Sequence, residues 1–172
     1  MKDILEARWG RGVVFQDTAS IRAGDVYPEV LRSGLSSCSV VIAVIGPNWL
    51  TSQNATGESR LAATDDWVRE ELAYALDSGI DLIPVLVRGA TPPTGMDLPT
   101  SIAKLANIQH FELSDSRFRQ EVTLLGTRIE DLIFSRYDTV WLRARLFAGL
   151  LHRRLVRLLL WGSIGAILGA TI

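Results

Sequence analysis

Short runs of apolar residues alternate along the chain with longer stretches in which apolar positions recur at helical spacing. Residues 40–46 are apolar without polar alternation, and residues 82–87 form a second run of this kind. A continuous apolar run between turn signals is typical of a strand that is covered on both faces of a parallel sheet. Shorter β-rich runs at residues 13–15 and 108–113 predict two further strands.

Helical patterns lie between these runs. Helices are expected at residues 25–37, 64–79, 101–106 and 114–134, where acidic or hydroxyl caps precede the apolar stripes. Strands and helices that alternate at this spacing predict an α/β fold. We expect a parallel sheet of about four to five strands with helices on both faces, formed by residues 1–134.

The chain changes character beyond this domain. Residues 135–157 combine apolar positions at helical spacing with arginines on the other face, and residues 158–172 carry no charge. A full membrane span needs about 20 apolar residues, and the last residues of the basic segment lengthen the run. We therefore expect a basic juxtamembrane helix and the start of a single-pass transmembrane helix, with the α/β domain in the cytoplasm. The alternative is a C-terminal hydrophobic helix that packs on the domain.

Charge and composition exclude several kinds of function. The net charge of −1 combines five arginines after Asp138 with −6 on the rest of the chain. An acidic body gives no electrostatic basis for binding nucleic acid. The single Cys38 excludes an internal disulfide, and with two separated histidines it gives no zinc-binding pattern, so no metal is assigned.

Five segments resemble, in order and spacing, the Toll/interleukin-1 receptor (TIR) domain of the bacterial type. They are residues 14–17, 20–25, 40–49, 66–72 and 83–87. The resemblance covers about residues 1–134 and implies a flavodoxin-like fold and a role in signalling. It also implies that residues 18–25 form a loop through which the domain associates with other TIR domains, including copies of itself.

The resemblance further implies that NAD+ is a substrate rather than a cofactor. Many members of the family cleave the bond between nicotinamide and ribose with a glutamate in a Trp-x-x-x-Glu motif, which Trp67 and Glu71 match. Helix geometry separates Glu71 from Glu70, because a rotation of about 100° per residue places Glu70 in solvent and Glu71 on the shoulder of the apolar face. A partly desolvated carboxylate can stabilise a ribosyl cation. The alternative is an acid that only faces water.

The other candidate site residues lie after the expected strands. Asp17 follows the first strand, at the edge where open α/β sheets bind ligands, although it could instead cap a turn. Ser20, Arg22 and Gly24 belong to the loop 18–25; Arg22 could contact phosphate or an acid of a partner, or be solvated. Trp49 is either a stacking surface or, more simply, a packing residue.

The chain departs from the family at its start. The family begins with an apolar strand and a turn that contains Ser, Tyr or Arg, whereas residues 4–9 resemble the end of the first helix. We therefore expect the first strand to be missing, exposed edges on its neighbours and little catalysis by this chain. Two main hypotheses remain: a membrane-tethered TIR signalling domain with NAD+ glycohydrolase activity, and a non-catalytic interaction scaffold. An unrelated receiver-like domain is a weaker third.

Overall fold

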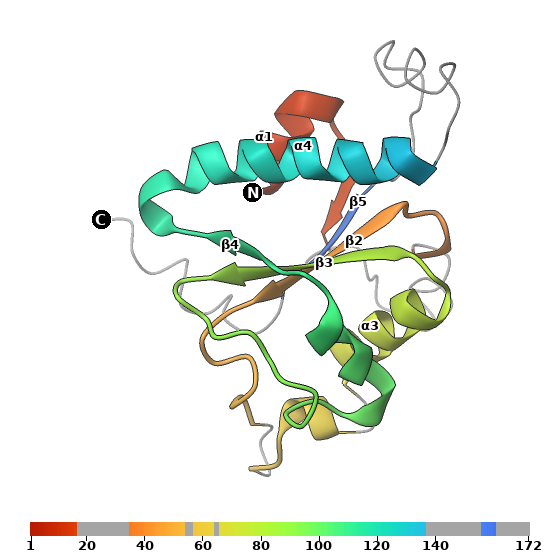
Figure 1. The fold of residues 1–172 in the computed structure, drawn as a ribbon, viewed down its shortest axis with the longest axis vertical. Coiled ribbons are helices and arrows are strands. Elements are labelled where there is room, and N and C mark those ends of the chain that lie inside the picture. The colour runs from red at the N-terminus through yellow and green to blue at the C-terminus, as the bar shows by residue number, and fades with distance from the viewer. Residues whose placement is uncertain (17–34, 54–56, 64–65, 137–155, 161–172) are drawn as a thin grey trace, which may run out of the picture.

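The computed structural model describes residues 1–16, 35–53, 57–63, 66–136 and 156–160 (Figure 1). The elements in chain order are α1 (Lys2–Trp9), β1 (Val14–Gln16), β2 (Val40–Ile45), η1 (Arg60–Ala62), α3 (Trp67–Asp77), β3 (Asp81–Val87), η2 (Thr100–Asn107), β4 (Phe111–Leu113), η3 (Asp115–Arg117), α4 (Phe118–Arg136) and β5 (Val156–Leu160). The strands form one parallel sheet of five strands in the order β1-β5-β2-β3-β4. The predicted α/β class is confirmed, with four of the strands within residues 1–134 and the fifth, β5, outside the predicted domain.

The apolar run at residues 40–45 lies inside the sheet, as predicted. It forms β2, which pairs with β3 from Val40 opposite Asp81 to Ile45 opposite Leu86. Successive side chains of β2 enter two separate cores, Ile42 on one face and Val41 on the other. Because both faces are covered by apolar groups, the strand needs no polar alternation.

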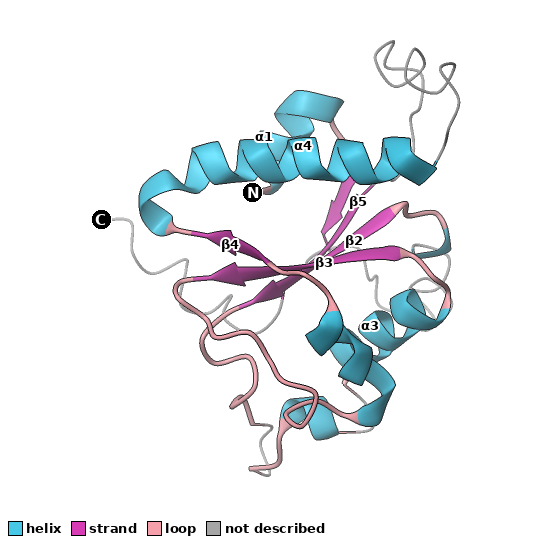
Figure 2. Cartoon of the chain, in the orientation of Figure 1, coloured by secondary structure: helices cyan, strands magenta, loops and turns pink. Residues whose placement is uncertain are grey.

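Helices cover both faces of the sheet (Figure 2). α1 and α4 pack together on one face, and α3 and η2 cover the other. The predicted apolar stripe of α4 is confirmed, since Val122, Leu125 and Ile129 are buried against Leu5 of α1. Each helical layer therefore has its own core, and the sheet separates the two.

The start and end of α3 follow the sequence signals closely. The side chain of Asp66 accepts a hydrogen bond of 2.9 Å from the backbone N–H of Arg69, which satisfies a free donor of the first turn. At the other end, the N–H of Ile80 donates to the carbonyl of Ala75 at 3.0 Å, and Gly79 takes a φ of 64°. This is a Schellman turn, which a left-handed glycine permits.

The C-terminal segment differs from the prediction. Residues 156–160 are a strand, so the helices expected over 135–157 and 158–172 are wrong for these five residues. A short apolar run is compatible with either structure, and the open edges of two neighbouring strands favour the extended one. Residues 137–155 and 161–172 lie outside the described part of the chain. Within the described part, no helix is long and apolar enough to cross a membrane.

β5 also corrects the expectation of an incomplete sheet. It lies between β1 and β2 and pairs with both in parallel, Val14 and Val40 lying opposite Val156. Flavodoxin-like sheets have their first strand at this central position. The place of the strand expected to be missing is therefore occupied by the C-terminal segment, and the predicted exposed edges of its neighbours are paired.

Candidate functional site

The structure describes three of the predicted site residues. Trp49, Trp67 and Glu71 lie in the described part of the chain. Asp17 and the three residues of the loop 18–25, Ser20, Arg22 and Gly24, lie outside it. Asp17 follows Gln16 directly, and Gln16 is the last residue of β1. The sequence therefore connects the loop to the carboxyl end of the sheet.

Glu71 is buried within α3. It is 3% exposed and belongs to the buried side of the helix together with Leu72 and Ala75, whereas the side chain of Glu70 is 53% exposed. The predicted difference between the two acids is confirmed, although Glu71 lies deeper than the shoulder position expected for it. Among the described residues, the buried charged side chains are Glu71 and Asp66, both near the start of α3.

The two buried acids have different environments. Asp66 caps the helix, and its second oxygen lies 3.9 Å from the guanidinium of Arg60. Its position is explained by these local contacts and by the favourable charge at a helix N-terminus. Glu71 is one turn further along, where it is no longer a cap. It lies on the buried side of α3 with Leu72 and Ala75.

The two tryptophans have opposite surroundings. Trp67 is the first residue of α3 and is 42% exposed, one turn before Glu71. Residues four apart on a helix lie on the same side, so an exposed ring and a buried carboxylate are neighbours along this helix. Trp49 is 3% exposed and packs in the same core as Leu61 and Leu72. This placement is that of a packing residue.

The topology places the beginning of α3 near the carboxyl ends of the parallel strands. α3 connects the parallel strands β2 and β3, so it runs back along the sheet and starts near the carboxyl end of β2. Open α/β sheets bind ligands at this edge. Glu71 lies one turn from that start, and Gln16 ends the parallel strand β1 at the same edge of the sheet.

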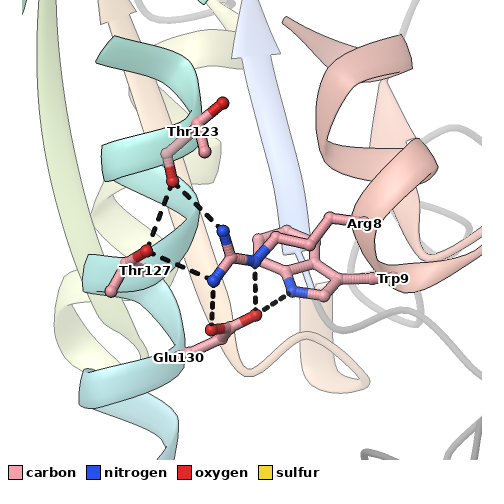
Figure 3. Close-up of polar contacts among 5 residues, drawn as sticks. All are labelled: Arg8, Trp9, Thr123, Thr127 and Glu130. Atoms are coloured by element: carbon pink, nitrogen blue, oxygen red, sulfur yellow. Dashed lines mark hydrogen bonds and ion pairs between the residues drawn. The ribbon is translucent and has the colours of Figure 1, made fainter. Parts of the chain in front are cut away.

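A second polar cluster joins α1 to α4, and sequence reasoning missed it (Figure 3). Arg8 donates from Nε and Nη2 to the two carboxylate oxygens of Glu130, both at 2.6 Å, and Trp9 donates from Nε1 to Oε1 at 2.7 Å. Arg8 also donates to the carbonyl of Thr123 and the hydroxyl of Thr127. No periodic pattern links Arg8 to Glu130, because they are 122 positions apart.

These five residues (Arg8, Trp9, Thr123, Thr127 and Glu130) form what we call the α1–α4 clamp. Its contacts shift the pKa values of Arg8 and Glu130. The hydrogen bonds from Arg8 hold the pKa of Glu130 below its ordinary value, against the opposing effect of partial burial. The same contacts raise the pKa of Arg8. Both directions favour the charged pair, which is the behaviour of a structural contact between two helices.

A groove of about 440 Å³ lies between α4 and the start of β3 and β4. Its lining includes Leu124, His110, Arg128 and Asp131, but none of the predicted site residues. It lies on the α4 face, away from α3. Within the described residues no group of three or more His, Cys, Asp or Glu is placed to hold a metal ion.

Comparison with known proteins agrees with the pattern of motifs. A sequence model of a family described as the TIR domain matches residues 2–125. The matched region runs from α1 into α4 and leaves β5 outside. No curated protein matches the chain.

Proposed function

The chain belongs to the TIR domain family, and we propose that it is a signalling domain that associates with other TIR domains and cleaves NAD+. In this proposal residues 18–25 form the association loop and Glu71 is the catalytic residue. The observation that supports catalysis is the burial of Glu71, at 3% exposure, beside the exposed ring of Trp67. A carboxylate beside an aromatic ring, near the edge where α/β sheets bind ligands, is placed where a catalytic group is expected.

The proposed reaction breaks one bond and forms another. The bond between nicotinamide and the ribose C1′ breaks, nicotinamide leaves with the electron pair, and the ribose acquires oxocarbenium character. Water then adds to C1′ and releases a proton, which gives ADP-ribose. The carboxylate of Glu71 would stabilise the cation, because a fixed negative charge acts more strongly in a site from which water is excluded.

The remaining candidate residues receive binding roles. The exposed face of Trp67 offers an aromatic surface for a planar ring of the substrate. Arg22 would contact the pyrophosphate, for which a guanidinium is a well-matched donor. Asp17, Ser20 and Gly24 would border the same pocket from the loop. Trp49 would support α3 from the core rather than contact the substrate.

A non-catalytic scaffold is the second candidate, and one observation favours it. An acid that is 3% exposed presents little surface to a substrate, so catalysis requires the groups that cover Glu71 to move. In the scaffold, Glu71 would only support the packing of α3. Association with other TIR domains is common to both candidates.

Release of nicotinamide from NAD+ by the concentrated chain tests the catalytic role. Turnover is expected to be slow, because the turn that follows the first strand in the family is not part of residues 1–172. Glu71→Gln should lower the rate at least about 100-fold, and Glu70→Gln on the neighbouring exposed position should leave it unchanged. Glu70→Gln should unfold at the temperature of the parent, and thermal unfolding should show that Glu71→Gln is folded at the temperature of the assay. An equal loss of rate in both variants would contradict a specific role of Glu71. No release of nicotinamide by a folded and associated parent would likewise favour the non-catalytic scaffold.

Attachment to a membrane in a single pass, with the domain in the cytoplasm, stays a prediction. It rests on the arginines after Asp138 and on the uncharged run 158–172, whose first three residues belong to β5. If the rest of the run is an anchor, the full chain should sediment with membranes and a chain ending at residue 160 should not. Equal distribution of the two chains would contradict the anchor.

A further inference from the structure

β5 is the one described strand that is out of sequence order in the sheet. The path from β1 through β2 and β3 to β4 crosses the sheet in one direction but passes over one position between β1 and β2. The last described element of the chain fills that position. Without β5 the sheet would be split, with β1 on one side of an open slot and β2 on the other.

The slot is a strong acceptor for a strand. Residues 14–16 of β1 and residues 40–44 of β2 pair with β5, so an empty slot would present two parallel edges facing each other. Unpaired backbone groups in a buried position are costly, and open edges bind any strand that fits. The slot is also inside the fold, since Val40 and Val41 are fully buried. A folded domain therefore needs a strand there.

The contacts of β5 do not require that the strand come from the same chain. Its main contacts are with β1 and β2, and both are parallel backbone pairings. Residues 137–155 separate it from α4. Arg157 lies in register with Phe15 and Val41, and a charged residue is unusual in a strand with two covered neighbours. The pairings that place β5 are thus between backbones, and the slot of a second copy would offer β5 the same two strand edges.

We propose that β5 is an exchangeable strand and that two copies of the chain each insert β5 into the slot of the other. The partner is a second copy of this chain, and the product is a symmetric strand-swapped dimer. A strand attached to its own domain competes at an effective concentration on the order of mM for short tethers. Insertion into the chain's own slot is therefore expected in dilute solution, and exchange where chains are concentrated, as in an assembly of TIR domains.

Mixed disulfide trapping tests the exchange. Ala43 of β2 lies opposite Leu159 of β5, and neighbouring strands are about 4.8 Å apart, which suits a disulfide. In a Cys38→Ala background, one chain carries Ala43→Cys and another carries Leu159→Cys. The two are unfolded, mixed, refolded together and oxidised, at several concentrations. We expect a covalent dimer of the two different chains, in a yield that rises with concentration.

Two control variants show whether a mixed disulfide reports strand exchange. The exposed Leu124→Cys, mixed with Leu159→Cys, measures random linkage, because Leu124 is 59% exposed on α4. A chain with both Ala43→Cys and Leu159→Cys reports insertion into its own slot as an internal link. The proposal fails if the yield of the mixed dimer does not exceed the yield with Leu124→Cys, while the double variant forms its internal disulfide at every concentration. It fails equally if the double variant does not link at all, since β5 would then not occupy the slot.

Discussion

Glu130 on α4 and Glu71 on α3 are both acids on helices that cover the sheet, and both have a tryptophan close by. The side chain of Glu130 is 28% exposed and accepts hydrogen bonds from Arg8 and Trp9. Glu71 is 3% exposed and follows an exposed Trp67 by one turn. The partners of Glu130 account for its position, because together they fasten α1 to α4. The pairing of an acid with a tryptophan is therefore not a sign of function by itself.

What separates the two acids is their place in the fold. Glu130 joins two helices on the side of the sheet that holds α1 (Figure 3). Glu71 lies near the start of a helix that begins at the carboxyl end of β2, where α/β sheets bind ligands. The comparison assigns a structural role to Glu130 and leaves Glu71 as the residue to which the proposed chemistry refers. The following variants test that division.

Truncation of one core residue on each face should have the largest effect. Leu125 on α4 and Leu72 on α3 are both fully buried, and Leu→Ala at either position should lower the free energy of unfolding by about 2–5 kcal/mol. Because both faces share one sheet, urea unfolding should show a single transition in each variant. A separate transition in either would show that the faces fold independently, and the comparison of their acids would lose its basis.

Replacement of Glu130 in the α1–α4 clamp should have the second-largest effect on stability. Glu130→Ala removes the acceptor of Arg8 and Trp9 and should lower the free energy of unfolding by about 1–2 kcal/mol, since the group is charged but partly exposed. Chemical denaturation measures the change. Glu112→Ala is the matched control on β4, where the side chain is 77% exposed, and it should change little. Equal effects at the two positions would contradict a structural role specific to Glu130.

Removal of the helix cap should cost less. Asp66→Ala deletes the acceptor for the N–H of Arg69 and should lower the free energy of unfolding by about 1 kcal/mol. Asp66→Asn, which keeps an acceptor oxygen, should retain most of that stability in thermal unfolding. Equal losses in the two variants would mean that the charge beside Arg60, rather than the cap, holds this residue.

Acid should weaken the clamp in a defined direction. The pKa of Glu130 lies below its ordinary value of 4.5, mainly because of the hydrogen bonds from Arg8. A carboxyl with a depressed folded pKa stabilises the protein above the unfolded pKa and loses that contribution as the pH falls through the folded value. The stability difference between the parent and Glu130→Gln should therefore be constant near neutral pH and shrink below 4.5. A difference that persists at lower pH would exclude the charge as its source.

Gly126→Ala should have the smallest effect, because two terms oppose each other. Alanine favours a helix by up to about 1 kcal/mol over glycine. A Cβ at this position would lie 3.3 Å from Cδ of Arg8 and 3.5 Å from Cδ2 of Leu5, so the side chain of Arg8 must shift by a few tenths of an ångström. We expect a net change below about 1 kcal/mol, and a more favourable change when Arg8 is first replaced by Ala. Additive effects would show that Gly126 does not set the distance between α1 and α4.

The regular elements could be predicted from the sequence because their signals are local. The apolar run of β2, the cap at Asp66 and the left-handed Gly79 each act within a few residues. The difference between Glu70 and Glu71 follows from helix geometry alone. The depth of Glu71 could not be predicted, because it depends on distant residues of the same core, such as Trp49.

Contacts between residues far apart in the chain leave no periodic pattern in the sequence. The clamp joins residues that are 122 positions apart, and single arginines and glutamates are usually solvated. β5 comes from an apolar run that suits a membrane helix as well as a strand, and its environment is set by a gap in a sheet more than a hundred residues earlier in the chain. Only the assembled topology distinguishes the two.

The central position of β5 also has a consequence for biosynthesis. Translation proceeds from the N-terminus at about 5–20 residues per second, so β1 to β4 leave the ribosome before the strand that joins β1 to β2. The nascent domain passes through an interval of seconds in which both core layers can begin to form around a divided sheet. The proposed exchange would have its opportunity in this interval, before a chain has made its own β5.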